Sequence, residues 1–212
     1  MFYRIYFLVF LPIISTFDCQ RVCSITVEIS EHTSREYLQW NLMELLSNRT
    51  ASYRTFQYSL STYSDYFELD SHILKYRLDE LDREQLCEQI EPCFLQLEIF
   101  TQTSFVILFK LIIIDINDWR PFFSQTYFAL TIRENLPTNY QVQLPIAVDY
   151  DSDQYNIDRY EFLNKTESIF QLEKSFDELK LNLIQQLDCE TKNNYQLFIQ
   201  AIDKGGLRSN IL

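Results

Sequence analysis

The sequence predicts an all-β protein made of two tandem sandwich domains of about 100 residues each. Three observations support this prediction. Short segments rich in Ile, Leu, Val, Phe and Tyr recur along the chain and are separated by turn residues. A long apolar segment, 105–114, stops abruptly at an acidic stretch that runs to Pro121. The order of strand-like and acidic segments before this stretch is repeated after it, which indicates an internal repeat.

The amino-terminal 18 residues are predicted to be a signal peptide. Arg4 precedes the apolar run 5–14, which is too short to cross a bilayer. A buried amino-terminal strand is the alternative. The apolar segment 105–114 has roughly half the length of a membrane-spanning helix, and it contains Lys110. The mature chain is therefore expected to be extracellular, with its cysteines used as disulfides.

Apolar patterns predict the strands of the first domain, residues 19–117. The segments 24–30 and 94–100 alternate between apolar and polar residues, and 105–114 is typical of a buried strand. Segment 35–46 fits either a short amphipathic helix or a turn. Further short strands are predicted at 54–60, 66–69 and 73–78.

The second domain, residues 118–212, repeats acidic positions of the first. A predicted strand at 128–132 is followed by Glu134, as the strand at 24–30 is followed by Glu31. An Asp-x-Glu triplet starts at Asp82 in the first block and at Asp188 in the second. The Glu-to-Asp separations, 31 to 82 and 134 to 188, are 51 and 54 residues. No final strand of the second domain is predicted before Leu212, so we expect the second repeat to be incomplete.

Composition and charge narrow the range of functions. The net charge of −12 argues against nucleic acid or anionic lipid as a partner. His32 and His72 are the only histidines, and no Ser or Cys has a recognisable nucleophile context. The paired carboxylates would suit a glycosidase, but they lie at strand ends beside a domain boundary. We therefore expect no enzymatic activity and no small-molecule substrate.

The acidic stretch has the chemistry of a cation site. Asp115, Asn117 and Asp118 place three oxygen-bearing side chains directly after an apolar strand, and Pro121 prevents the strand from continuing. Ca²⁺ binds six to eight oxygens, including several carboxylates. The alternative is an ordinary acidic turn, because Asp and Asn are common in turns.

At these positions the chain resembles the cadherin family, which has Greek-key β-sandwich repeats joined by calcium-binding linkers. The resemblance rests on four motifs: Leu81-Asp-Arg-Glu84, Asp115-x-Asn-Asp-x-x-Pro121, Ala147-x-Asp149-x-Asp151 and Ala201-x-Asp203-x-Gly205. Cys87 and Cys93, with five residues between them, are similar to the signature of a protocadherin amino-terminal repeat, and the resemblance implies that they pair. A giant or atypical cadherin is the alternative within the family. The pairing of Cys19, Cys23 and Cys189 is left open.

The resemblance also implies the ligands of about three Ca²⁺ ions. Trp119 stands where the family has Asn, at a position that gives its main-chain oxygen, and Cys189 stands where it has Arg. A second, partial set comprises Glu134, Asp188 and Glu190. The ligands of the complete set are Glu31, Asp82, Glu84, Asp115, Asn117, Asp118, Asp149, Asp151 and Asp203, with the main-chain oxygens of Ile116, Trp119 and Tyr155.

By resemblance, the expected function is calcium-dependent cell–cell adhesion by the extracellular part of a single-pass, membrane-anchored parent at the plasma membrane. The expected partner is a cadherin-like protein on an apposed cell, with self-recognition favoured. A heterophilic receptor and a secreted calcium-binding interaction module are the alternatives. No Trp lies near the mature start, so strand exchange is not expected. Asn48 and Asn164 begin glycosylation sequons.

Overall fold

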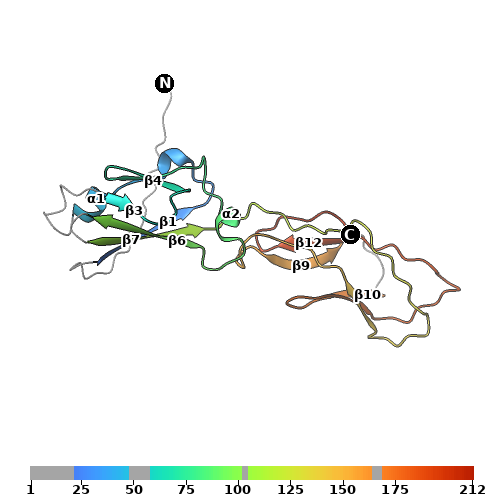
Figure 1. Cartoon of the computed structure of the whole chain (residues 1–212). Helices are drawn as coiled ribbons and strands as arrows, with labels where there is room; N and C mark the ends of the chain where they lie inside the picture. The colour runs from blue at the N-terminus through green and yellow to red at the C-terminus, as the bar shows by residue number, and fades with distance from the viewer. Residues whose placement is uncertain (1–21, 48–57, 102–104, 164–168) are drawn as a thin grey trace, which may run out of the picture. The chain divides into compact units, whose positions relative to one another are not determined.

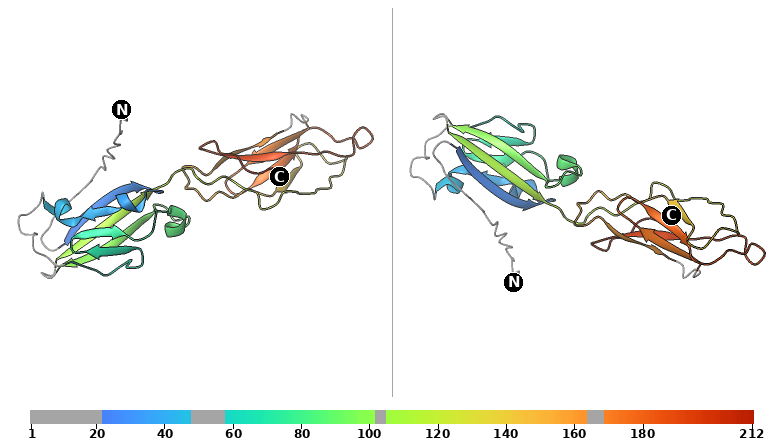
Figure 2. Two further views of the ribbon diagram at one scale, coloured as in Figure 1. Left: turned by 90° about the horizontal axis from the view of Figure 1, so that it is seen from above. Right: turned by 90° about the horizontal axis from the view of Figure 1, so that it is seen from below.

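The computed structural model describes residues 22–47, 58–101, 105–163 and 169–212. The chain divides into two compact units, Met1–Ile116 and Asn117–Leu212. Strands dominate both units (Figures 1 and 2). The predicted signal peptide, Cys19 and the sequon residues Asn48 and Asn164 lie outside the described residues. Among the residues that are described, no helix is long and apolar enough to cross a membrane.

The first unit is a sandwich of two sheets. Within its described residues, three short helical segments lie between the strands: η1 (Arg35–Tyr37), α1 (Leu42–Ser47) and α2 (Arg83–Cys87). One sheet has the order β1-β7-β6-β3 and the other β2-β5-β4. The strands are β1 (Val22–Ser30), β2 (Gln39–Asn41), β3 (Tyr58–Leu60), β4 (Phe67–Asp70), β5 (Ile73–Tyr76), β6 (Phe94–Thr101) and β7 (Val106–Ile114).

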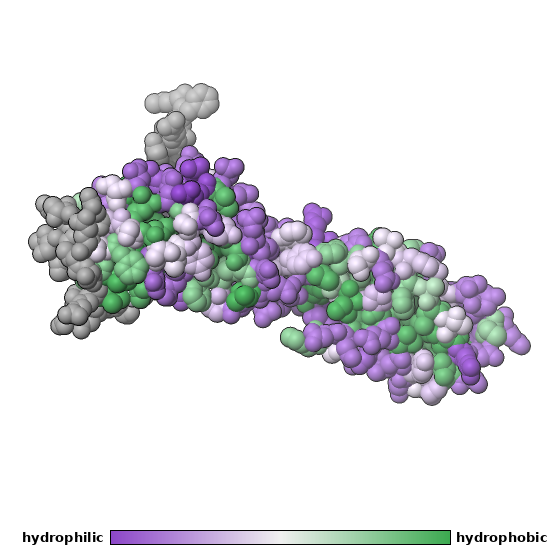
Figure 3. Space-filling model, viewed as in Figure 1, coloured by the Kyte–Doolittle hydropathy of each residue, from purple (hydrophilic) through white to green (hydrophobic). Residues whose placement is uncertain are grey.

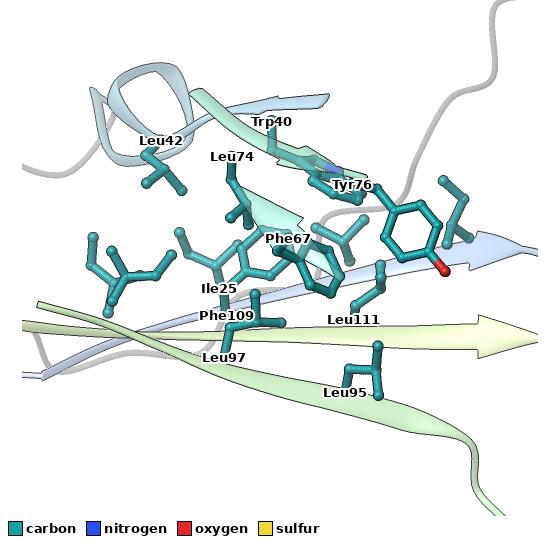
Figure 4. Close-up of a cluster of buried hydrophobic side chains, with 14 of the residues drawn as sticks. Ile25, Trp40, Leu42, Phe67, Leu74, Tyr76, Leu95, Leu97, Phe109 and Leu111 are labelled. Carbon is teal, nitrogen blue, oxygen red and sulfur yellow. The ribbon is translucent and has the colours of Figure 1, made fainter. Parts of the chain in front are cut away.

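Strand alternation builds the core of this sandwich. Every second residue of β1, β6 and β7 is buried, because successive side chains of a strand point to opposite faces. Trp40 of β2 packs against Phe67 and Phe109, with ring centroids 6.4 and 5.2 Å apart. Figure 4 shows the side chains of both sheets meeting in this core. The apolar contact between the layers fixes the ends of the strands, where the acidic residues lie.

Pairing of β1 with β7 brings two distant acidic residues together. The two strands are parallel, and their last residues, Ser30 and Ile114, are partners in the ladder. The amide of Glu31 continues the ladder by donating to the Ile114 carbonyl at 3.0 Å. Glu31 and Asp115 therefore leave the sheet side by side at the same edge.

The second unit has five strands among its described residues. They form one sheet of order β10-β11-β8 and one pair, β12-β9. The core includes Phe123, Leu144, Leu179, Leu181 and Ile199. The strands are β8 (Gln141–Leu144), β9 (Ile157–Phe162), β10 (Phe170–Lys174), β11 (Leu179–Leu183) and β12 (Ile199–Asp203).

Most of the predicted strands are confirmed. Segments 24–30, 94–100 and 105–114 correspond to β1, β6 and β7, and 66–69 and 73–78 correspond to β4 and β5. Of segment 54–60, the described residues 58–60 form β3. Segment 35–46 is not a single helix or turn, because it contains η1, β2 and the start of α1.

The strand predicted at 128–132 is wrong. These residues belong to no strand, although their pattern alternates. Phe128 and Leu130 are each 41% exposed, and with Ile132 they line an open cavity of about 340 Å³. A regular strand needs a ladder partner, and no described pairing includes this segment.

Candidate metal centre

The first unit contains a group of three carboxylates at the edge where β1 and β7 end. One oxygen from each of Glu31, Glu84 and Asp115 lies within 4.8 Å of the others. Glu31 is 2% exposed and Asp115 9% exposed. Buried carboxylates are costly unless they are paired or bind a metal. These residues therefore form an oxygen-rich group with the character of a cation site.

Main-chain contacts orient Glu31. One carboxylate oxygen accepts from the Arg83 amide at 3.1 Å and the other from the Ile116 amide at 2.7 Å. The pKa of Glu31 is raised to about 8, mainly by burial; a hydrogen bond with Asp115 contributes to the rise, while the two amide contacts oppose it. Without a metal ion, Glu31 therefore holds a proton at neutral pH.

The Asp-x-Glu segment is tied to the same edge by its backbone. The His32 amide donates to the Leu81 carbonyl at 2.7 Å. Asp82 is the N-cap of α2, and its carboxylate accepts from the Gln85 amide at 2.8 Å. This cap starts the helix at Arg83 and sets Glu84 toward Glu31 and Asp115. Asp82 itself lies outside the three-carboxylate group.

The second unit contains its own group of three carboxylates. Asp149, Asp151 and Asp203 each place an oxygen within 4.8 Å of the others, and they are 4, 3 and 1% exposed. Asp203 is the last residue of β12, and its Oδ1 accepts from the Leu207 amide at 2.8 Å. Asp149 Oδ1 accepts from the Asp151 amide at 3.2 Å. The carboxylates are thus held in place by neighbouring main chain.

Asn117 completes this second group. Its amide end lies 2.9 Å from Asp151 Oδ2 and 3.1 Å from Asp203 Oδ2. In one orientation the amide nitrogen donates to both carboxylates. In the other, the amide oxygen joins the two carboxylate oxygens, which is the orientation a cation would favour.

Gly205 gives the Asn117 amide its space. A Cβ atom at Gly205 would lie 2.0 Å from Asn117 Nδ2 and 2.5 Å from its Cγ. Any larger residue would push the amide away from Asp151 and Asp203. Glycine is therefore required here by close approach of a side chain, and not by an unusual backbone angle.

The remaining predicted ligands lie in the same short segments but outside both groups. Asp118 is exposed, and Ile116 belongs to the first unit. The Trp119 amide donates to Asp151 Oδ1 at 3.1 Å, while the Tyr155 carbonyl accepts from the Lys204 amide at 3.3 Å. In the sequence, these four residues lie within a few positions of the carboxylates alongside which they would bind the ion.

The partial ligand set of the second unit, Glu134, Asp188 and Glu190, repeats one hydrogen bond that is seen in the first unit. Glu134 accepts from the Cys189 amide at 3.2 Å, as Glu31 accepts from the Arg83 amide. Hydrogen bonds from Cys189 lower the pKa of Glu134, and hydrogen bonds from Thr191 lower that of Asp188. Glu134, Asp188 and Glu190 are exposed, and in the described part of the chain they form no carboxylate group like the other two.

The donor atoms of the two groups fit calcium. They are carboxylate and amide oxygens, with no sulfur or imidazole, and Ca²⁺ prefers such hard oxygen ligands. Two carboxylates about 5 Å apart repel by roughly 3 kcal/mol at an effective dielectric near 20. Glu31, Glu84 and Asp115 would hold an ion in the first unit, and Asn117, Asp149, Asp151 and Asp203 in the second.

A disulfide joins Cys87 to Cys93, with Cα atoms 5.6 Å apart, as the resemblance implies. Cys189 is a free, exposed cysteine. Cys23 is buried in the core. Cys19, whose pairing the sequence leaves open, lies outside the described residues.

Sequence reasoning did not foresee the contacts of Arg83, Tyr150 and Gly205 near these groups. Arg83 is 1% exposed and contacts Glu84 and Asp115. The Trp119 and Tyr150 rings meet edge-on, with centroids 5.1 Å apart. The spacing Ala201-x-Asp203-x-Gly205 pointed to Gly205, but the steric role of the glycine needs the position of Asn117.

Two protein-family models match the chain. The model of the cadherin domain matches residues 128–210, and a model described as cadherin-like matches residues 24–103. Each model therefore covers most of the described part of one unit.

Similar proteins and structures come from the same family. Protocadherin-17 of Homo sapiens is 30% identical over 165 residues, which cover 74% of this chain and 14% of that protein. Protocadherin-7 of Homo sapiens is 35% identical over 120 residues, which cover 51% of this chain and 11% of that protein. The chain thus spans only a small part of the length of these curated relatives.

Among solved structures, the Protocadherin GammaB4 extracellular domain matches with a TM-score of 0.73 and 26% identity. This match covers 87% of this chain and 30% of that chain. Protocadherin Gamma B2 extracellular cadherin domains 1-5 match with a TM-score of 0.66 and 25% identity, covering 90% of this chain and 37% of that chain.

Proposed function

Because the chain belongs to the cadherin superfamily, we propose that it mediates calcium-dependent cell–cell adhesion as the amino-terminal extracellular part of a protocadherin-like receptor. The observation that carries this proposal is the pair of carboxylate groups, one in each unit. Asp115 of the first group and Asn117 of the second are separated by one residue in the sequence. Ions held at either group therefore lie along the same short stretch of chain.

Calcium would supply the positive charge that these carboxylates need. Glu31, Glu84 and Asp115 would hold it in the first unit, and Asp149, Asp151, Asp203 and Asn117 in the second. Asp82, Asp118 and the main-chain oxygens of Ile116, Trp119 and Tyr155 would complete the shells. Binding would remove the repulsion among the carboxylates and order the segment between the units, which is the physical basis of the proposed calcium dependence.

An apolar outer face supports recognition through a sheet. On the side of β7 that points away from the core lie Leu108 and Ile112, both half-buried. Ile112 pairs with Phe94 of β6, and Phe94 and Phe100 are 39 and 38% exposed. Figure 3 shows hydrophobic residues among hydrophilic ones on the visible surface of each unit. An adhesive partner of the receptor would cover such apolar side chains.

Strand exchange is disfavoured by the position of Trp40. Its side chain is 5% exposed and packs in the core against Phe67 and Phe109. Donating it to a partner would open the sandwich and forfeit the burial of a large aromatic side chain. Association through sheet faces leaves this core intact.

We further propose that recognition is homophilic and that the parent chain is anchored in the plasma membrane. Beads coated with the full ectodomain of the parent test the first point. Beads of one kind should clump in calcium and disperse with a chelator. Clumping only when beads of two different proteins are mixed would favour a heterophilic receptor instead. Persistence of the clumps without calcium would contradict the proposed calcium dependence.

A further inference from the structure

Arg83 is a buried cation inside the acidic group of the first unit. Its side chain is 1% exposed. The guanidinium Nη1 donates to Glu84 Oε1 at 2.7 Å, and Nε lies 3.8 Å from Asp115 Oδ1. Two of the three carboxylates proposed to bind calcium are therefore in contact with one rigid, planar group.

The same guanidinium contacts the loop closed by the Cys87–Cys93 disulfide. Nη2 is paired with the Glu91 carboxylate, and Nη1 lies 3.5 Å from the Glu88 carbonyl oxygen. Glu91 is 43% exposed, whereas Arg83 is buried. Arg83 thus connects a loop at the surface to carboxylates inside the unit.

The second unit provides an internal comparison. There, Cys189 occupies the middle of the Asp-x-Glu triplet, and its amide keeps the contact to Glu134. No guanidinium is present at this position, and Glu134, Asp188 and Glu190 stay exposed and do not form a carboxylate group. The main-chain contact to the glutamate is therefore common to both units, whereas the guanidinium is a feature of the first unit alone.

We infer that Arg83 is a positioning residue that couples the disulfide-closed loop 87–93 to calcium binding in the first unit. The inference rests on the proposed function, because it concerns the same carboxylates. The loop holds Arg83 through Glu91, and Arg83 in turn holds Glu84 and Asp115 at ligand spacing. The negative charge of Glu91 also offsets the positive charge of Arg83, which would otherwise repel a bound cation. Both effects predict that loss of the Glu91 contact weakens calcium binding, although Glu91 is not itself a ligand.

The test is a calorimetric titration of the full chain with Ca²⁺. Glu91→Gln should weaken calcium binding roughly ten-fold, the scale on which groups that orient metal ligands act. Glu88→Gln is the matched control, since it removes an equal charge from the same loop but keeps the main-chain oxygen that meets Arg83. This control should change the affinity by less than about two-fold, as an exposed charge does.

A double-mutant cycle between Glu91 and the disulfide measures whether the two act through the same contact. A purely structural role of Arg83 would not produce such coupling in calcium affinity. Replacing both Cys87 and Cys93 by Ser should also weaken binding, and adding Glu91→Gln to that pair should weaken it little more, because both changes act through one contact. Circular dichroism verifies folding, and Glu91→Gln alone carries the test if the cysteine variant unfolds. Equal affinities of Glu91→Gln and Glu88→Gln would overturn the inference while leaving the proposed function intact. Absence of calcium binding by the unmodified chain would overturn both.

Discussion

Glu31 links calcium binding to protonation at the scale of a single residue. Its pKa is about 8 in the metal-free unit, mainly because of burial, against an ordinary value of 4.5. A raised carboxyl pKa means that the folded state holds a proton that the unfolded chain releases. In chelator, the free energy of unfolding of the first unit should therefore fall as pH rises from about 4.5 to 8.

Calcium should displace the Glu31 proton, so binding at pH 7 should release protons. Titration calorimetry in two buffers of different ionisation enthalpy measures this release. Glu31→Gln is the control: it should abolish the release and flatten the pH dependence in chelator. Calcium binding without proton release in the unmodified chain would show that Glu31 is already ionised.

The absence of a side chain at Gly205 should be necessary for tight calcium binding in the second unit. Gly205→Ala should weaken calcium binding roughly ten-fold, because the new Cβ would displace Asn117 from Asp151 and Asp203. Gly206→Ala is the matched control: Gly206 has a φ of 97° and open space around it, so this change strains the backbone without touching Asn117. Calcium titration and thermal unfolding separate the two effects. Equal calcium affinities would contradict the role of Gly205.

The inner and outer faces of β7 should respond differently to substitution. Phe109 points into the core and is fully buried, so Phe109→Ala should destabilise the unit by about 3–5 kcal/mol. Leu108 and Ile112 point outward. Replacing both by Thr puts a good strand-forming residue at each of these two positions. This double variant should change stability by less than about 1 kcal/mol.

The outward double variant should nevertheless reduce bead aggregation if the outer face of the sheet is adhesive. Denaturant unfolding measures stability, and the bead assay measures adhesion. Unchanged aggregation would assign adhesion to another surface of the receptor.

The same strands show what the sequence could predict. Segments 24–30, 94–100 and 105–114 were predictable because burial on one face imposes alternation or a long apolar run. The segment 128–132 has a similar pattern but forms no strand, because pairing depends on a partner that local sequence does not specify. β2 was missed for the converse reason, since its three residues are defined by pairing with β5.

The candidate metal centre was predictable in part from the sequence motifs. The motifs identify the carboxylates, and parallel pairing of β1 with β7 explains why Glu31 and Asp115 meet. The contacts of Arg83 with Glu91 and of Gly205 with Asn117 were not predictable, because they depend on how individual side chains pack in three dimensions.

At the scale of the whole molecule, the proposed ions should control the freedom of the two units. Asp115 and Asn117 flank the boundary between the units, so repulsion among carboxylates and its relief by Ca²⁺ act on the connecting segment itself. Without calcium the units should sample many relative orientations, and with calcium the range should narrow. Small-angle scattering should then give a longer and better-defined particle in calcium than in chelator.

The control for this scattering experiment is Asp149→Asn combined with Asp203→Asn, which removes two buried carboxylates from the second unit. This variant should fold, because Asn keeps the size of Asp and the Oδ1 atom that accepts from main-chain amides. It should need far more calcium to reach the same particle length, since fewer charged ligands lower the affinity of a calcium site. Identical scattering of the unmodified chain in calcium and in chelator would mean that the carboxylates do not govern the motion of the units.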